Sequence, residues 1–347
     1  MSKLGAVKGV AIWAVLTGFA LAVAGGVTLA RAQDKVVNVY SYRQPFLIRP
    51  FLDVFEKETG IRVNTVFATK GMVERLKREG RNSPADLILT VDIGRLHEAV
   101  EADVLQGVSS PTLERNVPSH YRHPDGLWYG LTVRSRVIMA SRERVSPDEL
   151  STHEALAEPR WKGRFCTRSS QHPYNVALLA SLIAHHGEEW AEDWARGVKN
   201  NLARKPQGND RAQVKAVYEG VCDIALVNSY YMGKMLQDEE QSKWANAVFI
   251  HFPNQQGRGA HVNISGAGVT KAAPHKADAV KLLEFLSGPL AQQMYAEQNY
   301  EYPVNPEAEW SGLLKSWGEF KADDLSLATV AEYRDEAIKV FDRVGFP

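Results

Sequence analysis

The chain of 347 residues contains 41 basic and 41 acidic side chains, and 44% of its residues are hydrophobic. These values are typical of a soluble globular protein and exclude collagen-like, low-complexity and coiled-coil classes. The length predicts two domains or one large two-lobed body. The chain has no excess of basic residues, so its charge gives no indication of a nucleic-acid partner.

The first 32 residues have the pattern of a signal peptide. Lys3 and Lys8 precede an uncharged apolar stretch over residues 9–30, and Ala30-Arg31-Ala32 is a small-x-small cleavage site. We therefore expect export, with cleavage after residue 32. The apolar stretch is just long enough to span a bilayer, so an uncleaved anchor stays an alternative. Without this segment the chain has 38 basic and 41 acidic residues.

The mature chain begins with alternating strand and helix patterns. They predict a strand at 36–42, a helix at 46–60, a strand at 61–67, a helix at 71–80 and a buried strand at 87–90. This order is typical of a parallel α/β unit. A second unit of the same kind follows the middle of the chain. Its expected elements are a strand at 164–167, helices at 174–186 and 210–220, and a strand at 222–228.

Two long strands are predicted at 131–139 and 262–269, and both are candidates for strands that cross from one lobe into the other. If both run from one lobe into the other, the chain forms two discontinuous α/β lobes joined by a two-strand hinge, a geometry that closes around a ligand. We expect an N-terminal lobe of residues 33–133 plus about 265–312, and a C-terminal lobe of about 134–264 plus 313–347. Amphipathic stretches at 277–287 and 328–344 predict helices near the end.

The only two cysteines, Cys166 and Cys222, both lie in short strand-like runs. In an exported protein such a sparse pair indicates a disulfide rather than a metal site. Two buried free thiols are the alternative.

No nucleophile elbow, P-loop, HExxH or dinucleotide-binding motif occurs, so the sequence gives no indication of an enzyme. Asn228-Ser229-Tyr230-Tyr231 ends a buried strand, and ligands bind at strand ends in open α/β sheets. Taken alone, adjacent tyrosines more often place one ring in the core and one outside.

Several short runs, in order along the mature chain, resemble the ferric-iron-binding proteins of bacterial ABC importers. These are class 2 periplasmic binding proteins, similar in shape to one lobe of transferrin. The matching runs are VYSYRQP (39–45), NSPAD (82–86), TVDIGRL (90–96), RSS (168–170), YN (174–175), PQGND (206–210), VNSYY (227–231) and NISG (263–266).

The resemblance implies that Tyr174, Tyr230 and Tyr231 bind Fe³⁺. Hard oxygen anions suit this hard cation, and three phenolates balance its three charges. It further implies delivery to an inner-membrane ABC permease with its ATPase, from a monomeric receptor in the periplasm. A receptor for a small organic solute, of the polyamine or thiamine type, is the alternative.

Gln44 and Pro45 depart from the Arg-His-Tyr run of many family members, so the N-terminal lobe lacks an anionic ligand there. The resemblance then implies a synergistic anion such as carbonate. Gln44, Arg134 and Ser170 are the expected donors. Arg136 alternates onto the same strand face as Arg134, so either arginine fits the role.

Three further side chains have secondary interpretations. Tyr42 is expected to pack in the core, with a role as a fourth phenolate as the alternative. Asp92 and Asp210 are expected to cap helices, with support of the ligand residues from behind as the alternative.

Overall fold

The computed structural model describes residues 35–347, so the predicted signal peptide lies outside the described residues. Lys35–Pro347 is one compact unit. No helix within residues 35–347 is both long and apolar enough to cross a membrane.

Nine strands form a sheet in which the main path runs β2-β1-β3-β8-β4-β6-β5, and β7 and β9 both pair with β4. The strands are β1 (Val36–Ser41), β2 (Arg62–Phe67), β3 (Leu87–Thr90), β4 (Tyr129–Ser141), β5 (Phe165–Cys166), β6 (Ile224–Asn228), β7 (Val248–His251), β8 (Val262–Val269) and β9 (Tyr302–Pro303). The two ends of this path are parallel pairs, β2 with β1 and β5 with β6, and antiparallel pairs join them in the middle.

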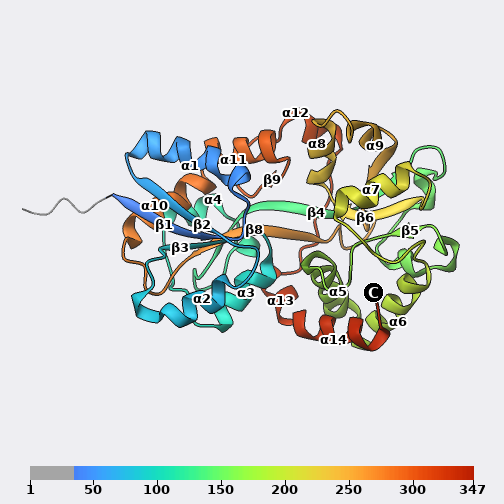
Figure 1. Ribbon diagram of the computed structural model, residues 1–347, viewed down its shortest axis with the longest axis horizontal. Coiled ribbons are helices and arrows are strands. Elements are labelled where there is room, and N and C mark those ends of the chain that lie inside the picture. Colours follow the sequence, from blue (N-terminus) through green and yellow to red (C-terminus); the bar gives the residue numbers. More distant parts are fainter. Residues whose placement is uncertain (1–34) are drawn as a thin grey trace, which may run out of the picture. The chain divides into compact units, whose positions relative to one another are not determined.

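The long strand β4 takes part in both halves of the sheet (Figure 1). Its first half, Tyr129–Ser135, pairs with β8, and its second half, Arg136–Ala140, pairs with β6. β8 in turn pairs with β3. The two crossover strands are therefore β4 and β8, and the predicted two-lobed α/β fold with a two-strand hinge is confirmed.

Helices cover both faces of each half. They are α1 (Pro45–Thr59), α2 (Met72–Glu79), α3 (Ile93–Glu101), α4 (Pro111–Asn116), α5 (Pro173–His186), α6 (Glu188–Asn200), α7 (Asp210–Tyr218), α8 (Tyr230–Leu236), α9 (Ser242–Asn246), α10 (Lys276–Ser287), α11 (Pro289–Met294), α12 (Gly312–Ser316), α13 (Leu327–Glu332) and α14 (Arg334–Val344). A π-helical turn, η6 (Tyr295–Asn299), follows α11.

Successive side chains from β1 onward point to opposite faces of the sheet, and each face packs against different helices. Val37 and Val39 point into the core beneath α1 and α10, whereas Tyr40 and Tyr42 pack with α2 on the opposite face. In the other half, Ile138 and Ala140 of β4 face the core formed by α5, α6 and α14. Helices thus cover both faces in each half, as is usual where parallel strands are joined by helices.

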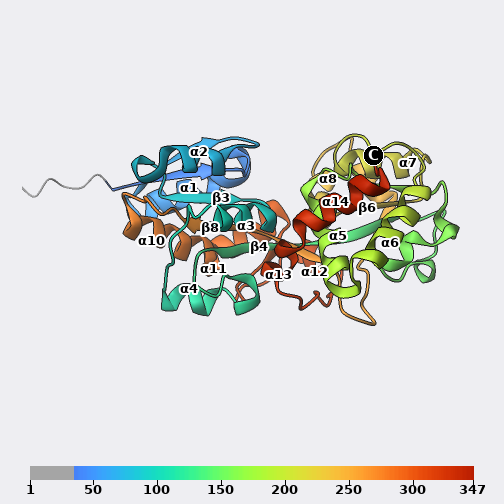
Figure 2. The ribbon, with the colours of Figure 1, turned by 90° about the horizontal axis from the view of Figure 1, so that it is seen from below.

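The predicted helix at 328–344 is divided in the structure, because Tyr333 separates α13 from α14. α13 lies between α3 and α5 in both views (Figures 1 and 2), and α14 packs on α5 and α6. The lobe boundaries expected from the sequence stay a prediction, since the described residues form one compact unit.

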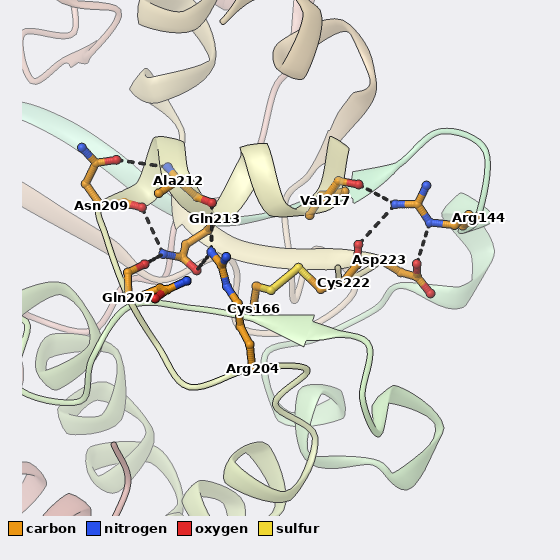
Figure 3. The surroundings of a disulfide bond; sticks show 10 residues. All are labelled: Arg144, Cys166, Arg204, Gln207, Asn209, Ala212, Gln213, Val217, Cys222 and Asp223. Carbon is orange, nitrogen blue, oxygen red and sulfur yellow. Dashed lines mark hydrogen bonds and ion pairs between the residues drawn. A yellow bond between two sulfur atoms is a disulfide. The ribbon is translucent and has the colours of Figure 1, made fainter. Parts of the chain in front are cut away.

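Cys166 and Cys222 form a disulfide, as the sequence predicted (Figure 3). It links the end of β5 to the segment just before β6, and these two strands are parallel neighbours. The segment between the cysteines, whose sequence separation is 56, carries Tyr174 and Asp210. The bond therefore closes the loop that holds two residues of the site described below, which reduces the entropy of the unfolded chain.

Candidate functional site

A cavity of about 270 Å³ lies where strands of the two halves end. The loop after β1 contributes residues 42–44, the first turn of α1 contributes Phe46 and Leu47, and the loop after β3 contributes Val91. The other half contributes residues from the first turns of α5, α7 and α8. The lining consists of Tyr42, Arg43, Gln44, Phe46, Leu47, Val91, Arg134, Tyr174, Arg211, Tyr230, Tyr231, Lys234, Asn299 and Glu301.

The three tyrosines implied by the resemblance all line this cavity. Tyr230 and Tyr231 are the first two residues of α8, directly after β6, and their ring centroids lie 4.3 Å apart. Tyr174 is the second residue of α5, after Pro173, which is well suited to a helix start. The hydroxyl oxygens of Tyr174 and Tyr230 lie 3.3 Å apart. Three phenols from two helices therefore converge on one space.

The surroundings of Tyr230 and Tyr231 oppose the ionisation of their hydroxyls. Burial raises the pKa of Tyr230 well above its usual value, and negative charge on Tyr174 or Tyr231 would raise it further. Burial also raises the pKa of Tyr231, and Asp210 adds to that effect. Both hydroxyls are accordingly protonated at neutral pH until a cation supplies compensating charge.

Of the two arginines expected from β4, Arg134 lines the cavity, and only 1% of it is exposed. Its Nη1 donates to the hydroxyl of Ser265 at 3.0 Å. Its Nε and Nη2 are buried and have no hydrogen-bond partner among the described residues. Buried donors of this kind are costly unless an acceptor satisfies them. The carbon of the guanidinium lies 5.5 Å from the ring centroid of Tyr174, so an acceptor here would sit beside the phenols.

A second buried arginine, Arg43, lies next to Arg134. Its Nη1 donates to the same Ser265 hydroxyl at 2.8 Å, and its Nη2 pairs with Glu301 at 2.5 Å. The Ser265 hydroxyl thus accepts from both buried guanidinium groups, whereas the Glu301 carboxylate pairs with Arg43. Lys234 and Arg211 add two further positive charges to the lining, so the cavity has an excess of positive charge.

Arg136 does not share this role, although it was an expected alternative to Arg134. Its Nη1 lies 2.5 Å from Asp210, and its Nη2 donates to Asn175 at 2.8 Å. Arg168 pairs with the other oxygen of Asp210 at 2.7 Å. These bonds occupy Arg136 beneath the cavity, so it is not one of the lining residues.

The capping role expected for Asp210 is wrong, whereas that for Asp92 is confirmed. Asn209 caps α7 instead, and Asp210 is fully buried. Its Oδ1 also accepts from the backbone N–H of Asn228, the last residue of β6. Burial acts to raise the pKa of Asp210, but Arg136 and Arg168 hold it below its usual value. Asp92 accepts from Gly94 N at the start of α3.

The other expected donors have different outcomes. Gln44 lines the cavity, just before α1. Ser170 does not, because its hydroxyl donates to the carbonyl of Phe346 at 2.8 Å; its expected contact with an anion is therefore not supported. The Tyr42 hydroxyl accepts from the N–H groups of Met72 and Val73, which favours its packing role.

Five polar lining residues were not predicted from the sequence: Arg43, Arg211, Lys234, Asn299 and Glu301. Arg43 stands within the first matching run, and Lys234 lies one helical turn after Tyr230, so both had a local signal. Asn299 and Glu301 had no local sequence signal, because they reach the cavity only through the packing of their distant segment against α1. No group of three or more His, Cys, Asp or Glu residues within 35–347 is arranged to hold a metal ion.

We predict that Asp210→Asn lowers the free energy of unfolding by about 3–5 kcal/mol, because it leaves two guanidinium groups without their carboxylate. Denaturant unfolding measures the change. Asp223→Asn is the matched control, since Asp223 also pairs with two arginines, Arg144 and Arg164, but its side chain is 18% exposed. It should cost about 1 kcal/mol or less per pair. Equal losses in the two variants would contradict this account.

Comparisons with known proteins agree with the geometry. The model of the bacterial extracellular solute-binding protein family matches residues 82–317. The iron uptake protein A1 of Synechocystis sp. is 46% identical over 317 residues, covering 90% of this chain and 88% of that protein. A thiamine-binding periplasmic protein of Brucella abortus is far less similar, at 22% over 84% of this chain and 85% of its own length.

Solved structures give the same result. Apo ferric ion-binding protein A of Pasteurella haemolytica is 51% identical with a TM-score of 0.86, covering 90% of this chain and 98% of its own. A Trichodesmium protein in complex with iron and citrate is 46% identical with a TM-score of 0.86, covering 90% and 100%. The resemblance predicted from the ordered motifs is confirmed, and the chain belongs to the family of bacterial extracellular solute-binding proteins.

Proposed function

We propose that this protein captures Fe³⁺ in its cavity through the phenolates of Tyr174, Tyr230 and Tyr231 and delivers it to an ABC-type permease. The observation that carries the proposal is the convergence of three phenols on one space, with two hydroxyl oxygens 3.3 Å apart. Neutral phenols gain little from such an arrangement, whereas a cation between them binds all three. The names of the similar iron-binding proteins support the same cargo.

The charge balance favours a trivalent ion. Fe³⁺ is a hard cation that prefers oxygen anions, and its charge is large enough to remove protons from phenols whose pKa values burial has raised. Three phenolates then neutralise three positive charges. A divalent ion would leave one negative charge in excess, so Fe²⁺ fits this ligand set less well.

An anion bound with the iron would complete the site. The Nε and Nη2 groups of Arg134, which have no partner within residues 35–347, are two donors beside Tyr174, and Gln44 offers an amide in the same lining. Carbonate and citrate both present oxygen acceptors that suit a guanidinium group. The iron–citrate complex of the Trichodesmium protein supports an anion of this kind.

The alternative of a small organic solute has less support. Polyamines and thiamine are cations, and a cavity lined by Arg43, Arg134, Arg211 and Lys234 against the single carboxylate of Glu301 disfavours them. Organic cations also bind more favourably to carboxylates and stacking aromatic rings than to phenols whose hydroxyl oxygens converge.

The setting of this function follows the family. A member of an extracellular solute-binding family works outside the cytoplasm, and we place this one in the periplasm, exported by the signal peptide of residues 1–32. It serves an inner-membrane permease and its ATPase as a monomeric carrier. The protein performs no chemistry on its cargo.

We predict that Tyr230→Phe and Tyr231→Phe each weaken Fe³⁺ binding by more than about a hundredfold, because each removes a charged ligand. The tyrosinate-to-iron charge-transfer band that colours the loaded protein should also weaken and shift. Visible absorbance during iron titration against a competing chelator measures both effects.

Tyr42→Phe is the control for this experiment. Tyr42 lines the same cavity, but its hydroxyl is bound by the backbone of α2. The variant should keep its colour and lose less than about fivefold in affinity. A colourless wild-type protein after iron loading, or normal colour in both Tyr230→Phe and Tyr231→Phe, would overturn the assignment.

Iron affinity should fall as the pH falls. The phenols are protonated in the free protein and ionised in the complex, so protons compete with iron at every pH below the raised pKa values. Each phenol adds about one unit to the slope of log affinity against pH. Titrations between about pH 6 and 8 should therefore give a slope about one unit smaller for Tyr231→Phe than for the wild type. Because both proteins use the same chelator, its own protonation cancels; an unchanged slope would contradict the role of Tyr231.

A further inference from the structure

The helix that carries the tyrosine pair also contacts the opposite half of the molecule. α8 packs against α7 and α9 on its own side. One turn beyond Tyr230 it meets the segment at the end of η6. That segment belongs with α1, since the rings of Tyr295 and Phe51 lie 4.2 Å apart and Asn299 donates to the carbonyl of Leu47 at 3.1 Å.

Lys234 forms the polar part of this contact. Its Nζ donates to the backbone carbonyl of Gln298 at 2.6 Å and lies 3.5 Å from Oδ1 of Asn299. The same ammonium is 5.4 Å from the ring centroid of Tyr300, within the range of a cation–π interaction. A lysine of α8 therefore binds a backbone group whose position is set by the other half of the sheet.

Gly233 forms the apolar part. A Cβ atom at this position would lie 2.2 Å from Cγ of Tyr300 and 2.6 Å from both neighbouring ring carbons. The ring of Tyr300 thus rests directly on the backbone of α8, and any larger residue at position 233 would push it away.

The backbone that presents this ring is itself unusual. Tyr300 has φ of 58°, a left-handed conformation that costs a non-glycine residue free energy. It follows the five-residue π-helical turn η6, and such turns are frequent at functional sites. Both features direct Tyr300 towards α8. The contact of its ring with this helix offsets the free-energy cost of the left-handed conformation.

We propose that Gly233 and Lys234, together with Gln298, Asn299 and Tyr300, form a contact between the lobes that positions the tyrosine-bearing helix and slows the release of bound iron. We call these five residues the α8–η6 contact. Hinged two-lobed proteins release their ligands by opening, and separation of the lobes must break this contact one helical turn from Tyr230. The inference rests on the proposed function, because it concerns the retention of the same cargo.

Gly233→Ala tests the proposal without altering any charge in the cavity. We expect iron release to an excess of chelator, followed by loss of the visible band, to become about tenfold faster or more, because the added methyl group displaces Tyr300. In a Tyr300→Gly background, which removes the ring, Gly233→Ala should have no further effect on the release rate. That non-additivity identifies the ring contact as the cause.

Lys234→Met provides a second test that keeps the aliphatic stem. It should also speed release, and the effect should persist at high salt, where the long-range attraction between this ammonium and an anion bound with the iron is screened. Lys199→Met is the matched control, since Lys199 donates to the carbonyl of Val344 at 2.8 Å between α6 and α14, within one half of the molecule. Its release rate should equal that of the wild type.

The outcomes separate this inference from the function on which it rests. A wild-type protein that forms no coloured complex contradicts the proposed function and this inference together. A coloured wild type whose release rate is unchanged by both Gly233→Ala and Lys234→Met contradicts the inference alone. If circular dichroism shows that Gly233→Ala does not fold, Lys234→Met decides the question.

Discussion

A phenol taken from water resists ionisation, and burial raises the pKa values of Tyr230 and Tyr231 above those of free tyrosine. The site therefore stays neutral until a cation of high charge enters. Once one phenolate forms, its charge raises the pKa of the next, so only an ion that contacts all three oxygens overcomes the penalty. Because of this cost of ionisation, the three tyrosines bind weakly charged ligands poorly and are well suited to Fe³⁺.

Buried ion pairs hold the phenols in place. Asp210 joins Arg136 and Arg168 to the end of β6, from which α8 and its tyrosines begin. Arg136 also donates to Asn175, the neighbour of Tyr174, so Asp210 is connected through Arg136 to both tyrosine-bearing helices, α5 and α8. Arg134, in contrast, has two donor groups without an acceptor within residues 35–347. Arg136 and Arg168 are therefore structural, whereas Arg134 in the cavity lining is available to an anion.

The sequence predicted what local patterns encode. Alternation and apolar runs located β4 and β8, and ordered motifs identified the three tyrosines, which the fold brings together. Prediction from the sequence failed where the two residues of a contact are distant in the chain. Nothing near Asp210 indicates that it pairs with Arg136, 74 residues away, and nothing near Ser170 indicates that Phe346 takes its hydroxyl. The contact between Tyr300 and Gly233 was equally hidden, because it depends on a left-handed residue that no propensity favours.

The central claim is that the three phenol oxygens meet at one Fe³⁺ ion. A crystal structure of the iron-loaded protein, with anomalous data collected at the iron edge, tests it most directly. The account predicts one anomalous peak within bonding distance of the hydroxyl oxygens of Tyr174, Tyr230 and Tyr231, with an anion between the iron and Arg134. An iron peak elsewhere, or one bound by none of these tyrosines, would contradict it.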